Sequence, residues 1–153
     1  MKYNEQCLDE TIDCVYIREV NYYETDMMKV VHHSNYIRWF EEARTYLLDC
    51  LGYPYAKIEE QGVMIPVLSV SCDYKLPCRF GEKVSIITKL VYYNGVRMKL
   101  CYEIWDEAHT GLRVTGTSAH CFVDTDFRPV SIKKKLPEMH EIFMNTLKDA
   151  KKA

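Results

Sequence analysis

One stretch of the chain decides the fold: residues 34–52, which read SNYIRWFEEARTYLLDCLG. Its apolar side chains recur at the spacing of an α-helix and form a single stripe. The stripe consists of Tyr36, Phe40, Ala43, Leu47 and Leu51, and it is widened by Ile37, Trp39, Tyr46 and Leu48. Ser34 or Asn35 is a candidate N-cap before it, and Gly52 is a stop signal after it. We therefore expect a long central helix that is buried on more than one side.

The segments around this helix carry the signals of strands. Runs of alternating or β-branched residues predict strands over residues 14–22, 63–74, 83–93, 97–104 and 111–123. Asn94-Gly95 predicts a hairpin turn, and the following alternation places Met98, Leu100, Tyr102 and Ile104 on one face. A short helix is expected between Pro54 and Gly62.

One strand, a long helix and then four strands in hairpin succession predict an α+β domain. We expect a single domain over residues 1–153, with a mostly antiparallel five-stranded sheet wrapped around the helix. A last helix at about residues 137–151, opened by Pro137, would cover an edge or an end of the sheet.

The composition excludes several classes of protein. Hydrophobic residues make up 48% and charged residues 27% of the 153 residues, which is typical of a globular protein, and the net charge of −2 does not favour nucleic acid. Residues 1–13 contain no apolar stretch that would form a signal peptide or a membrane span, so we expect a cytoplasmic protein. The lysine run at residues 133–135 is typical of a solvated surface.

The cysteines and histidines predict neither disulfides nor a metal site. Seven cysteines are scattered through apolar segments without a Cys-x-x-Cys pair, which favours reduced, mostly buried thiols. The five histidines supply no set of ligands at metal-binding spacing.

Asp26 lies on an apolar loop just before the helix. A carboxylate beside an electropositive helix end is suited to attack a carbonyl, or to activate water against it. Met27 and Met28 flank the acid and would leave it poorly solvated and more reactive. The alternative is an aspartate that accepts local backbone hydrogen bonds in a turn. His32 and His33 more often pack or cap a helix start than act in acid–base chemistry.

Residues along this loop and helix form a signature. They are Thr25-Asp26, Val30-Val31, His33, Asn35-Tyr36, Phe40-Glu41 and Ala43-Arg44. Further matching residues are Pro66, Val70-Ser71-Cys72-Asp73-Tyr74, Pro77, Arg79, Gly81-Glu82, Phe122-Val123 and Arg128-Pro129-Val130. Over most of its length the chain resembles hot-dog-fold acyl-CoA thioesterases of the 4-hydroxybenzoyl-CoA thioesterase type.

The resemblance implies roles for individual residues. Asp26 would be the nucleophile or general base in hydrolysis of an acyl-CoA thioester, and the backbone N–H of His33 would polarise the carbonyl. Glu41 can face the acyl pocket, although an ion pair with Arg44 is slightly favoured from the spacing. Lys29 stands where the family usually has glycine, and it adds a cation that would meet a phosphate or crowd the pocket.

Coenzyme A belongs to the substrate, so no separate cofactor is expected. Basic residues near strand ends are candidates for binding its phosphates, although each would also be ordinary on a protein surface. These candidates are Arg79, Arg97, Lys99 and Arg128, of which Arg128 matches a family position closely.

The resemblance also implies a homodimer or a dimer of dimers, because the sites of the family lie between two subunits and a lone sheet leaves an open edge. Asp26 would then face residues 66–69 of the neighbouring subunit. Two other functions stay open: a hot-dog enoyl-CoA hydratase or dehydratase, which needs a paired histidine and acid, and an acyl-CoA-binding module without catalysis.

Overall fold

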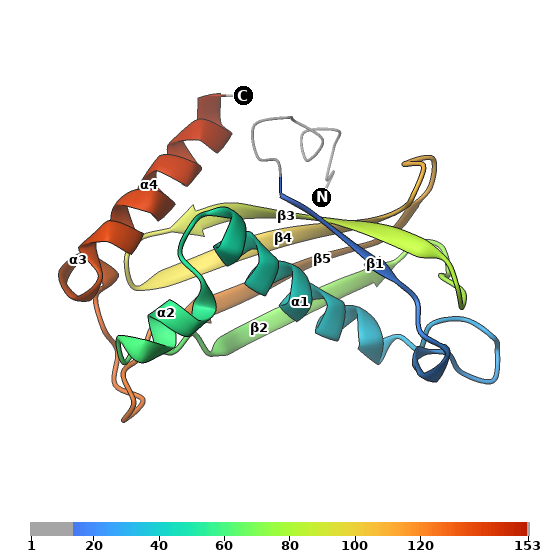
Figure 1. Cartoon of the computed structure of the whole chain (residues 1–153), viewed down its shortest axis with the longest axis horizontal. Coiled ribbons are helices and arrows are strands. Elements are labelled where there is room, and N and C mark those ends of the chain that lie inside the picture. The colour runs from blue at the N-terminus through green and yellow to red at the C-terminus, as the bar shows by residue number, and fades with distance from the viewer. Residues whose placement is uncertain (1–13, 153) are drawn as a thin grey trace.

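The computed structural model describes residues 14–152. It contains one five-stranded antiparallel sheet that curls around helix α1 (Figure 1). The strands are β1 Val15–Glu19, β2 Val67–Tyr74, β3 Lys83–Tyr93, β4 Arg97–Asp106 and β5 Leu112–Cys121. The helical elements are the 3-10 turn η2 Tyr22–Glu24, α1 Ser34–Cys50, α2 Tyr55–Glu60, α3 Ile132–Lys135 and α4 Pro137–Lys152. The predicted α+β class and the wrapped sheet are confirmed.

The strands lie in the order β1-β3-β4-β5-β2, so β1 and β2 are the two edges. Strands β3, β4 and β5 follow one another as hairpins, but the predicted hairpin succession is wrong for β2, which pairs with β5. The chain between β2 and β3 crosses one end of the sheet, where Lys75 N and Leu76 N donate to Arg113 O at 2.8 and 3.0 Å. Strand pairing between distant segments leaves no mark on local periodicity.

The core lies between α1 and the concave face of the sheet. Phe40 stacks on Tyr102 of β4, with ring centroids 4.3 Å apart and planes 13° apart. The predicted face of β4 is confirmed, since Met98, Leu100, Tyr102 and Ile104 are all buried. The widening of the helix stripe holds for Trp39 and Leu48 only, because Ile37 and Tyr46 are 41% and 38% exposed.

Helix α4 packs against β3 at one end of the sheet, as predicted (Figure 1). Tyr93 of β3 meets Phe143 of α4 edge-on, with ring centroids 5.1 Å apart. Met139 contributes a fully buried side chain to the same junction. The three lysines of α3 are exposed, which agrees with a solvated run.

The prediction that all cysteines are reduced is wrong for one pair. The structure joins Cys14, just before β1, to Cys50 at the last turn of α1 by a disulfide. Their Cα atoms lie 6.1 Å apart, within the usual range for such a bond, although 36 residues separate them in sequence. Cys72, Cys78 and Cys121 are thiols, and Cys7 lies outside the described residues.

Gly116 of β5 sets how closely α1 approaches the sheet. A Cβ atom there would lie 2.5 Å from Phe40 Cζ and 2.7 Å from Ser71 O, so the helix or the edge strand would have to move.

We expect Gly116→Ala to lower the free energy of unfolding by about 1–3 kcal/mol in urea denaturation. Gly111→Ala is the control, because its Cβ would meet its nearest neighbour, Leu76 Cδ1, at 3.5 Å. Equal stability of the two variants would contradict this account.

Candidate active site

A small pocket lies where the loop after η2, the start of α1 and the end of β2 meet. Its lining includes Asp26, Val31, His33, Tyr36 and Tyr74. Asp26 is half-buried, and Tyr36 is buried beneath it in the core. The pocket therefore combines a carboxylate, a helix N-terminus and apolar walls.

The loop that carries Asp26 is a tight turn. Asp26 N donates to Val30 O at 2.9 Å, and Lys29 N donates to Asp26 O at 2.9 Å. Lys29 has a φ of 63°, a conformation that glycine adopts at no steric cost. The glycine-like turn is thus kept with lysine at this position, and the lysine side chain is exposed.

Asp26 is not enclosed by the two methionines beside it. Met27 and Met28 are 100% and 76% exposed, so the prediction that these two side chains desolvate the carboxylate is wrong for the single chain. Met28 lines the same pocket as Asp26, and its backbone N–H donates to Asp26 Oδ1 at 2.8 Å. This bond is the local turn contact expected for an aspartate.

Helix α1 begins at Ser34, with His33 in the N-cap position and no side-chain cap. Neither candidate cap acts as one: Ser34 Oγ bonds with His32 Nδ1 at 2.8 Å, and Asn35 Nδ2 donates to Glu24 O at 2.8 Å. Within residues 14–152 the His33 N–H has no hydrogen-bond acceptor. Ser34 N donates to His32 Nδ1 at 3.3 Å and Asn35 N donates to His32 O at 2.9 Å. The open His33 N–H and the helix dipole therefore make this end of α1 attractive to a negative oxygen.

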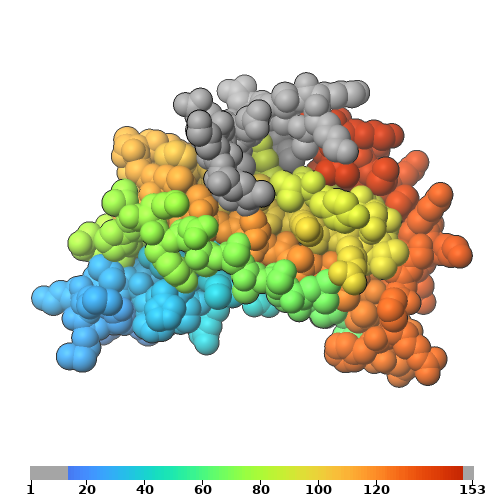
Figure 2. Space-filling model, turned by 180° about the vertical axis from the view of Figure 1, so that it is seen from behind, coloured from blue at the N-terminus to red at the C-terminus, as the bar shows by residue number. Residues whose placement is uncertain are grey.

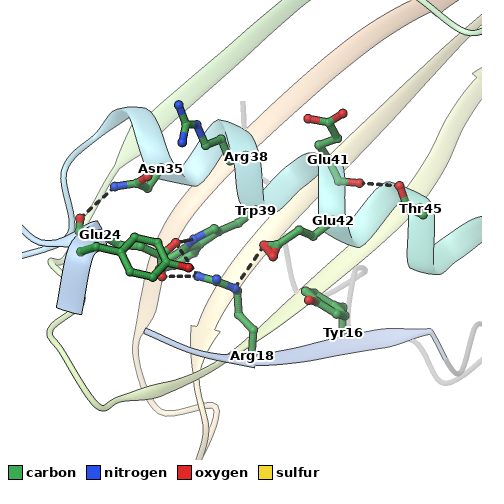
Figure 3. Close-up of a pocket in the computed structure, with 10 residues that line it drawn as sticks. Tyr16, Arg18, Glu24, Asn35, Arg38, Trp39, Glu41, Glu42 and Thr45 are labelled. Carbon is green, nitrogen blue, oxygen red and sulfur yellow. Dashed lines mark hydrogen bonds and ion pairs between the residues drawn. The ribbon is translucent and has the colours of Figure 1, made fainter. Parts of the chain in front are cut away.

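A cluster of charged groups lies beside the loop, on the β1 side of α1 (Figure 3). Glu24 is 4% exposed and binds the Arg18 guanidinium and the Trp39 indole N–H. Figure 3 shows Glu42 directed toward Arg18, whereas Glu41 points away from it. Arg18 and Glu24 were not among the predicted site residues, and Trp39 was expected only in the apolar stripe of the helix. The sequence signal that could have pointed to Glu24 is the three-residue spacing of a capping box between Asn21 and Glu24.

The predicted ion pair between Glu41 and Arg44 is absent from the described residues. Arg44 Nη1 instead lies 3.3 Å from Nε2 of His120, which is fully buried. His120 Nε2 bonds with Ser118 Oγ at 2.7 Å, and Ser118 Oγ bonds with Tyr102 OH at 2.7 Å. Burial, together with the positive charge of Arg44, lowers the pKa of His120 to about 4. The histidine is therefore neutral in the folded protein at pH 7.

The predicted coenzyme A contacts fall into two groups. Arg79 lies on the β2–β3 connection at the Asp26 end of the molecule, next to Cys78, whose carbonyl accepts from Val31 N at 2.8 Å. Arg97, Lys99 and Arg128 lie toward the β3–β4 turn and the β5–α3 connection, at the other end of the sheet (Figure 1). In Figure 2 the blue Asp26 loop and the orange β5–α3 connection occupy opposite ends of the molecule. One chain alone does not bring these three residues to Asp26.

Two further expectations concern metals and membranes. No group of three or more potential ligands among the described residues has the arrangement to hold a metal ion. Among the helices of residues 14–152, none is long and apolar enough to cross a membrane.

Comparison with known proteins identifies the class. The chain matches the model of the thioesterase-like superfamily over residues 20–147. It therefore belongs to this superfamily, and its fold is the hot-dog fold that the sequence resemblance predicted.

Individual relatives match most of the chain. It is 37% identical over 126 residues to a putative acyl-CoA thioesterase, YneP, of Bacillus subtilis (strain 168), a match that covers 82% of this chain and 91% of that protein. A putative esterase of Aquifex aeolicus (strain VF5) is 33% identical over 125 residues, covering 82% and 95%. The structure resembles a DHNA-CoA thioesterase from Staphylococcus aureus with a TM-score of 0.83 and 34% identity, covering 86% and 88%.

The buried His120 makes stability depend on pH. Its folded pKa lies below the ordinary value, so the unfolded chain binds more protons between about pH 4 and 6.5, and stability falls as the pH falls through that window. We expect the parent protein to lose on the order of 1–2 kcal/mol more than His120→Gln between pH 7 and 5 in urea denaturation. Carboxylates that titrate at lower pH are common to both proteins. Parallel losses would contradict a neutral buried histidine.

Proposed function

We propose that this protein hydrolyses an acyl-CoA thioester to the free acid and coenzyme A. The observation that carries the proposal is the pocket that the Asp26 carboxylate shares with His33, whose backbone N–H is the open donor at the N-terminus of α1. A thioester bound there has its carbonyl carbon near the carboxylate and its oxygen near the helix end. The names of the relatives, an acyl-CoA thioesterase and a DHNA-CoA thioesterase, support the same class of substrate.

The chemistry follows from these two groups. As a general base, Asp26 takes a proton from water, and the hydroxide formed attacks the thioester carbon. As a nucleophile, it attacks that carbon itself and forms an acyl anhydride, which water then cleaves. In both routes the electron pair of the C–S bond leaves with sulfur, and coenzyme A departs as a thiol after protonation.

The helix end acts on the carbonyl oxygen. Negative charge builds on that oxygen as the tetrahedral intermediate forms, and the His33 N–H is aligned with a dipole worth roughly half a positive charge at the N-terminus. Donors of this kind contribute about 3–4 kcal/mol to a transition state in a well-studied protease. Because the helix is fixed in the core, the donor needs no rearrangement during the reaction.

The edge strand β2 is the proposed dimer interface. It carries unpaired backbone groups on one side and four exposed apolar side chains: Val67, Leu68, Val70 and Tyr74, at 52%, 48%, 40% and 50%. A row of this kind on an open edge is a template for pairing with a second strand. The order of the sheet leaves β2 unpaired on that side in one chain.

In a two-fold dimer that pairs antiparallel β2 strands, the basic residues that lie far from Asp26 in one chain would come close to Asp26 of the other chain. Such pairing brings the start of β2 of one subunit beside the end of β2 of its neighbour, where Tyr74 lines the Asp26 pocket. Residues 66–69 of the neighbour then face Asp26, and its Arg97, Lys99 and Arg128 lie on the same side as the reacting thioester. Lys29 and Arg79 would come from the subunit that supplies Asp26, and Glu41 from its helix α1.

Asp26→Asn tests the catalytic assignment. We expect the rate of thiol release from a panel of acyl-CoAs to fall by about 100-fold or more, because an amide is neither a base nor a nucleophile at pH 7. Asp49→Asn is the control, since Asp49 is an exposed acid at the other end of α1. An unchanged rate in Asp26→Asn would sink the assignment. Water addition to an enoyl-CoA, or tight binding without turnover, would favour the hydratase or the binding module instead.

Val70→Lys tests the interface. We expect the parent protein to sediment as a dimer or a dimer of dimers and the variant to shift toward monomer, because a charge on each strand repels its copy across the two-fold axis. Ile17→Lys on the opposite edge, β1, is the control, and its native side chain is 60% exposed. Dissociation in the control alone would move the interface to β1, and a monomeric parent protein would refute the dimer.

A further inference from the structure

Glu24 is a charged side chain in a buried place, which is costly unless every oxygen has a partner. Its Oε1 accepts from Arg18 Nη1 at 2.8 Å and from Asn21 N at 2.9 Å. Its Oε2 accepts from Arg18 Nη1 at 2.9 Å and from Trp39 Nε1 at 2.6 Å. Burial alone would raise the pKa of Glu24, but the hydrogen bonds from Arg18 and Trp39 outweigh it and hold the pKa below the usual value. The carboxylate is therefore ionised and held from three directions.

The partners of this carboxylate come from different elements. Arg18 is on β1, and Trp39 is on the first half of α1 (Figure 3). The Arg18 guanidinium also lies over the Trp39 ring, 4.4 Å from its centroid, and pairs with Glu42 at 3.1 Å. The side chain of Glu24 thus ties the edge strand to the central helix.

The backbone of Glu24 ties the two ends of the Asp26 loop together. Its carbonyl oxygen accepts from His32 N at 2.9 Å and from Asn35 Nδ2 at 2.8 Å. One residue further, Thr25 forms an antiparallel bridge with Val31. Residues 25–31 are therefore a closed loop whose base is Glu24.

This base stands between the two groups of the proposed site. Asp26 is two residues after Glu24, and His33 is one residue after His32, which donates to Glu24 O. We propose that Glu24, held by Arg18 and Trp39, is a positioning residue that fixes the Asp26 carboxylate relative to the N-terminus of α1. The inference rests on the proposed function, in which these two groups act on one thioester. It deepens that proposal because Glu24 itself touches no substrate.

A purely structural ion pair would leave a different kinetic signature. Loss of a structural contact lowers the amount of folded protein, whereas loss of positioning lowers kcat in molecules that stay folded. A displacement of about 1 Å is enough to slow an enzyme by about 100-fold. The substrate pocket is unchanged by a shift of the carboxylate alone, so KM is expected to change little.

The test compares Glu24→Gln with Glu42→Gln, because both variants remove a carboxylate from the same arginine. Glu42 is the more exposed partner, with 40% of its side chain accessible. Among residues 14–152 it forms an ion pair with Arg18 and no hydrogen bond or ion pair with the Asp26 loop. At a temperature well below the melting temperature of every variant, we expect kcat of Glu24→Gln to fall by about 10- to 100-fold, with KM within about 3-fold. Glu42→Gln should keep kcat within about 2-fold of the parent value.

Trp39→Phe keeps the inference testable if Glu24→Gln does not fold. It removes the indole N–H and retains an aromatic ring, so a positioning role predicts a fall of kcat in the same direction by about 3-fold or more. The double variant Glu24→Gln/Asp26→Asn completes the experiment. If Glu24 acts through Asp26, the double variant will be no slower than Asp26→Asn when the two are compared at equal concentrations of folded protein.

The outcomes separate the two proposals. If Asp26→Asn is as active as the parent protein, the proposed function is wrong in its catalytic residue. If Asp26→Asn is inactive but folded Glu24→Gln and Trp39→Phe match Glu42→Gln in kcat, the positioning role is wrong and the proposed function stands. A further loss of rate in the double variant, at equal folded protein, would also overturn the positioning role.

Discussion

The close contact between α1 and the concave face of the sheet is the constraint on which the rest of the molecule depends. Phe40 lies flat against Tyr102, and Gly116 on the neighbouring strand leaves room for that ring. A side chain at position 116 would force the helix or the edge strand β2 to move. The contact therefore sets the height of the whole helix, including its N-terminus, above the strands.

The position of the candidate site follows from this contact. Because the helix is held along its length, its first turn lies at a fixed place at one end of the sheet, beside the end of β2. Tyr74 OH donates to His33 O at 3.1 Å and joins that end of β2 to the helix start. The loop with Asp26 then needs to be placed only with respect to the helix start, which is the task we assign to Glu24.

Much of this arrangement was predictable because local patterns encode it. The apolar stripe of α1, the alternation of β4 and the Asn94-Gly95 turn each depend on residues close in sequence, and Gly52, with a φ of 79°, follows the helix as predicted. Three features join residues 36 or more positions apart: the pairing of β2 with β5, the Cys14–Cys50 disulfide and the approach of Arg44 to His120. No local pattern records such contacts, so the spacing of Glu41 and Arg44 pointed to the wrong partner.

The candidate site also contains residues that a local pattern predicted and residues that no local pattern predicted. Asp26 and His33 were predicted from a local motif and lie on one pocket, and Lys29 adopts the left-handed conformation that explains glycine in the family. The contacts that join Glu24, Arg18 and Trp39 were not predicted, because these residues lie on three different elements. In the sequence, Arg18 and Glu24 look like ordinary surface charges, and Trp39 looks like an ordinary core residue.

Holding the Asp26 loop with a buried charge is costly, since an apolar replacement of a buried ion pair is often equally stable or more so. Apolar contacts, however, are non-directional. Met27 and Met28, the two apolar side chains next to Asp26, are also largely exposed. The bonds to Glu24 oxygens, between 2.6 and 2.9 Å, constrain direction as well as distance. Under the proposed function the loop presents one carboxylate to one carbonyl carbon, and for that task the direction of these bonds matters more than added stability. The buried carboxylate is thus better explained by the geometry it imposes than by the stability it adds.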